Sequence, residues 1–265
     1  MGSATREALA SSRSVLSGSV ASIDLATGES LFTAGRAVGA SSQLLSALAD
    51  PSASAAAKVT LVKAVFGSTV TPQALDLLGA VVAERWSEHD DLLAGIEDLG
   101  LRATAISAPA DVSIGAELFA FGTAVSSDAE LELALASKLG RPSAKAGLVD
   151  ALLAGKVSGE TLAIVRHLVQ QPRGRRIGEL LRHAAAVVAD QAGMSIATIT
   201  SAGALAPAQI QRLTENLSER YGRKLSINLV VDPAVLGGVR IQIGDDVIDG
   251  SIATRLADLR LQLAR

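Results

Sequence analysis

The hydrophobic period of this chain changes once, at about Gly193. Before that point apolar residues recur at intervals of three and four, and after it they alternate. The first pattern is seen in Ile114, Leu118, Phe121 and Val125, and the second in Leu225, Ile227, Leu229 and Val231. A period near 3.6 marks one face of a helix and a period of two marks a half-buried strand. The sequence therefore predicts a long helical region followed by a small domain with strands.

The composition supports closely packed helices. Hydrophobic residues make up 49% of the 265 residues, whereas aromatic residues make up only 2%. A core of Ala, Leu and Val suits short helices better than a β-sandwich. We expect an α+β fold, with a mostly α-helical N-terminal bundle, a second helical array, and a small C-terminal strand–helix–strand–strand–helix domain.

Several classes of function find no support in the residue types. The chain has no cysteine, and its three histidines, His89, His167 and His183, stand in no metal-ligand spacing. The net charge of −3 gives no reason to expect nucleic-acid binding. No apolar run is long enough to cross a membrane, and no nucleophile or phosphate loop is visible. We therefore expect no catalytic residue, cofactor or metal, and a protein that is not an enzyme.

An internal repeat is visible in the helical region. Lys58 corresponds to Lys145, and the same offset of 87 joins Leu75 to Leu162 and Val82 to Val169. Ser41-Ser42 matches Ser126-Ser127 at an offset of 85, which would require two inserted residues near Asp50-Pro51. The stretch 107–192 is therefore predicted to be an inserted helical array that partly repeats residues 41–104.

Three surface features have alternative interpretations. Asp245, Asp246 and Asp249 lack calcium-loop spacing and are expected to form a solvated turn. The basic residues Arg166, Arg173, Arg175 and Arg176 indicate a solvated face, or else a contact for an acidic helix or anionic headgroups. Leu75, Leu78 and Val82 share one helical face, which suits either a simple core or a groove for a partner helix.

The segment from Ile227 to Asp245 reads INLVVDPAVLGGVRIQIGD and continues as DVIDGSI. Asp232-Pro233 should end a strand and force a turn, and Gly237-Gly238 should supply backbone angles that side chains forbid. Gly244 suits a hairpin turn, and Asp249-Gly250-Ser251 leads into a helix capped by Ser251. This ordered set resembles the signature of the delta subunit of F-type ATP synthases, the family of the oligomycin-sensitivity-conferring protein. In that family the signature marks an attachment domain.

The resemblance implies a division into three parts. Residues 1–106 are similar to the family's N-terminal six-helix bundle, and residues 193–265 to its C-terminal α+β, stalk-binding domain. The stretch 107–192 departs from compact members and is similar to the long delta subunits of actinobacteria. The family's seat for N-terminal helices of the alpha subunits lies on the first and fifth helices, which implies contacts from Leu75, Leu78 and Val82.

Two functional hypotheses follow. The resemblance implies a non-catalytic stator subunit that links the alpha/beta catalytic head to the end of the b subunit in the peripheral stalk and resists rotor torque during proton-driven ATP synthesis. Such a subunit would be peripheral, at the cytoplasmic face of the cell membrane, within a hetero-oligomeric complex. The alternative is a helical adaptor or scaffold outside the ATP synthase.

Overall fold

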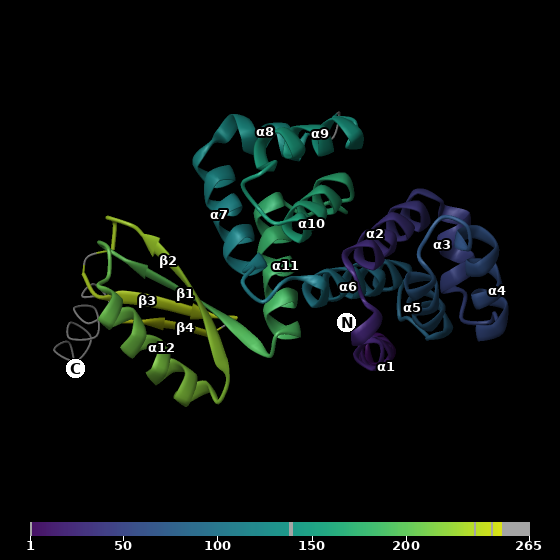
Figure 1. The fold of residues 1–265 in the computed structure, drawn as a ribbon, viewed down its shortest axis with the longest axis horizontal. Coiled ribbons are helices and arrows are strands. Elements are labelled where there is room, and N and C mark those ends of the chain that lie inside the picture. Colours follow the sequence, from purple (N-terminus) through teal and green to yellow (C-terminus); the bar gives the residue numbers. More distant parts are fainter. Residues whose placement is uncertain (1, 138–139, 236, 245, 251–265) are drawn as a thin grey trace, which may run out of the picture. The chain divides into compact units, whose positions relative to one another are not determined.

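The structure is a computed structural model that describes residues 2–137, 140–235, 237–244 and 246–250. The chain forms two compact units, Met1–Val188 and Ala189–Arg265, which are considered separately below (Figure 1). The predicted α+β class is confirmed, with helices up to Gln191 and strands after it.

The first helical array contains six α-helices. Their bounds are α1 Ser3–Gly18, α2 Leu25–Ala40, α3 Ser42–Ala49, α4 Ala55–Phe66, α5 Pro72–Ala83 and α6 His89–Ser107, with a 3-10 turn at Val20–Ser22. Side chains at the N-caps define four of these starts: Asp24, Ser41, Ser54 and Thr71 each accept a hydrogen bond from a backbone N–H three residues later. Such caps satisfy donors that have no partner inside the helix.

Glycines allow α2 and α6 to pack very closely. A Cβ atom at Gly100 would lie 2.6 Å from the ring of Phe32, and one at Gly28 would lie 2.2 Å from Thr104 Oγ1. Neither contact leaves room for a side chain. Helices α2 and α6 therefore cross at close range, and the core of the first array contains Leu31, Ala34 and Leu99, none of which is exposed.

The second array follows the plan of the first. Its helices are α7 Ile114–Ser127, α8 Ala129–Ala136, α9 Pro142–Leu153, α10 Gly159–Gln170 and α11 Ile177–Gln191. Both ends of α8, α9 and α10 lie 87 residues after the ends of α3, α4 and α5. The N-cap Ser158 likewise matches Thr71, and the buried Lys145 matches the buried Lys58.

The repeat continues without an insertion. Ser41 caps α3 and Asp128 caps α8, so the two caps also differ by 87 residues. The pairing of Ser41-Ser42 with Ser126-Ser127 at an offset of 85 is therefore wrong, because Ser126 and Ser127 still belong to α7. Two adjacent serines are common at helix ends. Matching the two serine pairs by identity alone therefore aligned the start of one helix with the end of another.

The second unit contains a four-stranded sheet in the order β2-β1-β3-β4. Its elements are β1 Met194–Ser201, α12 Pro207–Tyr221, β2 Lys224–Val231, β3 Val239–Ile243 and β4 Asp246–Asp249. β1 pairs parallel to β2 and antiparallel to β3. Leu217 of α12 packs with Ile199, Leu225 and Ile241, which share one face of the sheet.

The strand pattern differs from the expectation in one element. β4 follows β3 through a turn at Gly244, so the described order is strand–helix–strand–strand–strand. The sequence predicts this hairpin turn but not the strand that follows it, because the four residues of β4 show little alternation. The predicted final helix and its cap Ser251 lie outside the described residues.

Candidate functional site

Helix α1 is held against α5 and α6 by polar contacts. Thr5 Oγ1 donates to Asp91 Oδ2 at 2.5 Å, and Ser11 Oγ donates to Glu84 Oε1 at 2.6 Å. Arg13 makes two hydrogen bonds to the buried Asp98, at 2.7 and 2.9 Å. Paired guanidinium–carboxylate bonds fix orientation as well as distance. These bonds fix α1 against α6 and the end of α5. We name the surface formed by α1 and α5 the α1–α5 surface.

The three predicted contact residues occupy different environments on α5. Leu78 and Val82 are 1% and 0% exposed and lie in the core of the first array. Leu75 is half-buried at the edge of that core, so part of its side chain remains accessible to a partner. On α1, Val15 is 42% exposed. Leu75 and Val15 are thus apolar side chains of the α1–α5 surface that a partner could reach.

A buried charged cluster joins the two arrays. Glu97 of α6, whose side chain is 3% exposed, accepts hydrogen bonds from Arg173 and Arg175, each at 2.7 Å. His167 of α10 is 1% exposed, and its ring stacks on Phe32 of α2 with centroids 4.3 Å apart. We call Glu97, Arg173, Arg175 and His167 the junction cluster.

The contacts of His167 show which of its two ring nitrogens carries the proton. Nδ1 faces Arg36 Nη1, and Nε2 faces Glu97 Oε2, both at 3.5 Å. A guanidinium can only donate, so Nδ1 is the acceptor and Nε2 carries the proton of a neutral ring. Burial lowers the pKa of His167 below its usual 6.5, and attraction to Glu97 offsets this only in part.

Glu97 remains ionised in spite of its burial. Burial alone would raise the pKa of this carboxyl group, but His167, Arg173 and Arg175 together lower it from 4.5 to about 2. An ionised buried group is stable only while its partners stay in place. The junction cluster is therefore an ion-pair network that depends on both arrays.

The basic run was mainly expected to form a solvated face, and the structure corrects this for Arg173 and Arg175, whereas Arg166 and Arg176 keep much of their surface exposed. Arg173 and Arg175 turn inward onto Glu97, with side chains 19% and 30% exposed, while Arg166 pairs with Asp150 of α9. The reason is that the loop after α10 meets α6, an encounter across more than 70 residues. One sequence signal was missed: Glu97 falls four residues after Leu93, on the apolar face of α6.

Acidification is expected to destabilise the first unit in two pH ranges. Because burial holds the ring of His167 neutral, the unfolded state takes up a proton first as the pH falls below about 6.5, and stability falls with it. Glu97 adds stability above pH 4.5 that is lost as the pH falls towards about 2. Urea unfolding at pH 7.5 and 5.5, followed by the fluorescence of Trp86, tests the upper range.

His167→Phe should remove most of the loss between pH 7.5 and 5.5, because phenylalanine has no proton to gain. His89→Gln, at the exposed start of α6 in the same unit, is the matched control and should behave as wild type. An unchanged pH response in His167→Phe would contradict the assignment.

The signature residues shape the second unit. Asp232 N donates to Ser201 O at 2.8 Å, and its Oδ1 accepts from Ala234 N at 2.9 Å, which forms the turn that Pro233 continues. Gly237, Gly238 and Gly244 have φ of 71°, 79° and 57°. Gly250 N donates to Val239 O at 3.0 Å, directly after Asp249 ends β4. These residues build turns and edges of the sheet.

The sheet also has exposed apolar side chains. Leu229 and Val231 of β2 are 41% and 56% exposed, and Val247 of β4 is 48% exposed. Leu229 and Val231 lie on the face that packs against α12 nearer the start of β2. Val247 pairs with Gln242 and so lies on the opposite face, at the other edge of the sheet. Leu229 and Val231 alone therefore indicate one exposed apolar interaction surface.

The described residues contain no group of three or more metal-ligating side chains. His89 and His183 are exposed, and neither joins the junction cluster. Within the same residues, no helix has the length and hydropathy needed to cross a bilayer.

Comparison with known proteins gives a consistent result. The sequence pattern of the family described as ATP synthase delta (OSCP) subunit matches residues 102–263. The ATP synthase subunit delta of Leifsonia xyli subsp. xyli is 57% identical over 264 residues, covering 100% of both chains. The ATP synthase subunits delta of Kineococcus radiotolerans and Streptomyces griseus subsp. griseus are 39% and 37% identical, covering 90% and 100% of this chain and 87% and 100% of theirs. The chain belongs to the ATP synthase delta (OSCP) subunit family.

Proposed function

We propose that this protein is the stator subunit that links the alpha/beta catalytic head of an F-type ATP synthase to its peripheral stalk. Family membership over the whole chain carries the proposal. Subunits of this family are non-catalytic parts of a hetero-oligomeric complex. The work of this chain is mechanical: it keeps the head from turning with the rotor while proton flow drives ATP synthesis.

The proposal assigns a partner to each end of the chain. The α1–α5 surface receives an N-terminal helix of an alpha subunit, with Leu75 and Val15 among its contacts. The C-terminal part, residues 193–265, holds the end of the b subunit, supported by the exposed Leu229 and Val231 on one face of the sheet. The arrays 1–106 and 107–192 form the span between these ends, at the cytoplasmic face of the cell membrane.

Two features of the first unit suit a link that carries load. Helix α1 is held on α6 by the pair of the half-exposed Arg13 with the buried Asp98, so little conformational entropy is lost when a helix docks on the α1–α5 surface. The junction cluster ties the second array to the first through several charge-assisted bonds. A link under load needs this stiffness, whereas an adaptor outside the ATP synthase has no such need.

Leu75→Arg in the full chain is expected to weaken binding to the isolated alpha/beta head at least tenfold, because the variant places a charge in an apolar contact. Surface plasmon resonance with immobilised head measures the change. Leu133→Arg, at a position of α8 that is 73% exposed, is the matched control and should bind as wild type. Unchanged head binding by Leu75→Arg would remove this helix from the proposed contact.

A further inference from the structure

The offset of 87 residues relates every helix of the second array to a helix of the first. It carries α2 onto α7, then α3, α4 and α5 onto α8, α9 and α10, and finally α6 onto α11. A polar contact is repeated with these helices. Thr71 N donates to Ser30 Oγ at 3.3 Å, and their counterparts, Ser158 N and Glu117 Oε1, are joined at 3.1 Å. The repeated unit therefore consists of the helices α2–α6, and α1 stands outside it.

The same offset carries α1 onto α6. Residues 3–18 move to 90–105, and α6 spans His89–Ser107. All buried positions of α1 correspond to buried positions of α6: Thr5 to Leu92, Ala8 to Gly95, Leu9 to Ile96, Ser12 to Leu99 and Leu16 to Ala103. Helix α1 contacts α5, and α6 likewise contacts α10, the counterpart of α5. Helix α6 therefore occupies the place of α1 in the second array.

Helix α6 is also buried on almost every side. Within Leu92–Thr104 only Ala94 is not buried, whereas a helix at the surface of a bundle keeps a polar face towards water. Two adjacent carboxylates of α6 hold opposite arrays. Asp98 accepts hydrogen bonds from Arg13 of α1, and Glu97 accepts them from the two arginines of the junction cluster. Helix α6 thus belongs to the interior of both arrays.

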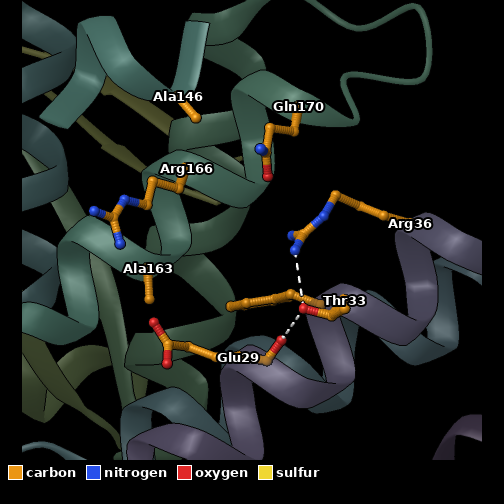
Figure 2. Close-up of a pocket in the computed structure, with 8 residues that line it drawn as sticks. Glu29, Thr33, Arg36, Ala146, Ala163, Arg166 and Gln170 are labelled. Carbon is orange, nitrogen blue, oxygen red and sulfur yellow. Dashed lines mark hydrogen bonds between the residues drawn. The ribbon is translucent and has the colours of Figure 1, made fainter. Parts of the chain in front are cut away.

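One side of the direct contact between α2 and α10 is open to water, in contrast. Figure 2 shows Glu29, Thr33 and Arg36 of α2 facing Arg166 and Gln170 of α10 across a pocket of about 400 Å³. Polar side chains that face each other across such a space contribute few packing contacts. The two arrays are therefore joined chiefly through α6 and the buried side chains beside it.

We propose that α6 is a shared helix, the last of one six-helix bundle, α1–α6, and the first of a second, α6–α11, so that no hinge separates the two arrays. Neither bundle can lose α6 without exposing its own apolar core, so the two should unfold together. The shared helix follows from the structure alone. Its use, a span that does not bend under torque, rests on the proposed function.

Native-state hydrogen exchange of the full-length protein tests the coupling. Val62 of α4 and Val149 of α9 are both buried and occupy the same position of the repeat, so Val62→Ala and Val149→Ala remove the same atoms from each array. The slowest amides exchange only when a whole cooperative unit unfolds. Each variant should therefore speed the slowest amides of α4, α5, α9 and α10 alike, at least tenfold. Faster exchange only in the array that carries the substitution would overturn the proposal.

Trp86 provides a second readout, because the chain's single tryptophan lies in the core of the first array. In urea, Val149→Ala should lower the midpoint of its fluorescence transition as much as Val62→Ala does. Ile241→Val, in the core of the second unit, is the control and should leave this midpoint and the exchange of both arrays unchanged. A midpoint that Val149→Ala leaves unchanged would contradict the shared helix.

Glu97→Gln separates the shared helix from the ion pairs that lie on it. In this background Val149→Ala should still speed exchange in α4 and α5, because the apolar faces of α6 remain in both cores. Loss of that coupling would show that the junction cluster, and not α6, joins the arrays, and would overturn the proposal. No alpha or b subunit takes part in these measurements, so a negative result would leave the proposed function standing.

Discussion

Glu97→Gln is expected to lower the free energy of unfolding of the first unit by about 3 kcal/mol. Glutamine fills the same space but leaves Arg173 and Arg175 without their counter-charge. Loss of one partner of a fully buried ion pair costs about 3–5 kcal/mol, and the lower end applies because both guanidiniums keep some access to water. Urea unfolding followed by the fluorescence of Trp86, the chain's single tryptophan, measures the change.

The matched control is Asp150→Asn. It breaks the pair between Arg166 and Asp150, whose side chains are 40% and 39% exposed. A pair so accessible to solvent contributes less than about 1 kcal/mol. Equal, small losses in the two variants would show that the junction cluster does not tie the arrays together.

Gly238→Val is expected to abolish binding of the b subunit while head binding persists. Gly238 has φ of 79° and follows Gly237, at 71°, directly before β3. A residue with a branched Cβ in this region costs about 2 kcal/mol or more, because Cβ clashes with the backbone. β3 carries Ile241 and Ile243 of a small core, so the second unit should lose its sheet. Binding of full-length variants to immobilised b peptide and to isolated head gives both affinities.

Gly203→Val is the control for this substitution. Gly203 lies in the same unit, has no positive φ, and has open space where a Cβ would stand. This variant should bind the b subunit as wild type does. Equal loss of head and stalk binding in Gly238→Val would contradict a chain whose two ends act independently.

Local features of the structure could be predicted from the sequence because they depend on near neighbours. Thr71 caps α5, with Pro72 in the first turn, as expected from their order in the chain. The alternation of Val239, Ile241 and Ile243 placed their side chains on the core face of β3. Serine pairs did not predict the alignment of the repeat correctly, since Ser126-Ser127 ends a helix whereas Ser41-Ser42 begins one.

The sequence alone determined the helical region, the change to strands after Gly193, and the glycine-rich turns of the second unit, since caps, periods and positive φ act within a few residues. Only the tertiary structure decided that Arg173 and Arg175 turn inward onto Glu97, and that α2 and the segment after α10 come into contact. These outcomes depend on which helices meet across 70 residues or more. The same arginine is a solvated charge or a buried ion-pair partner depending on which helices pack together. The hydrophobic period of the sequence does not determine that packing.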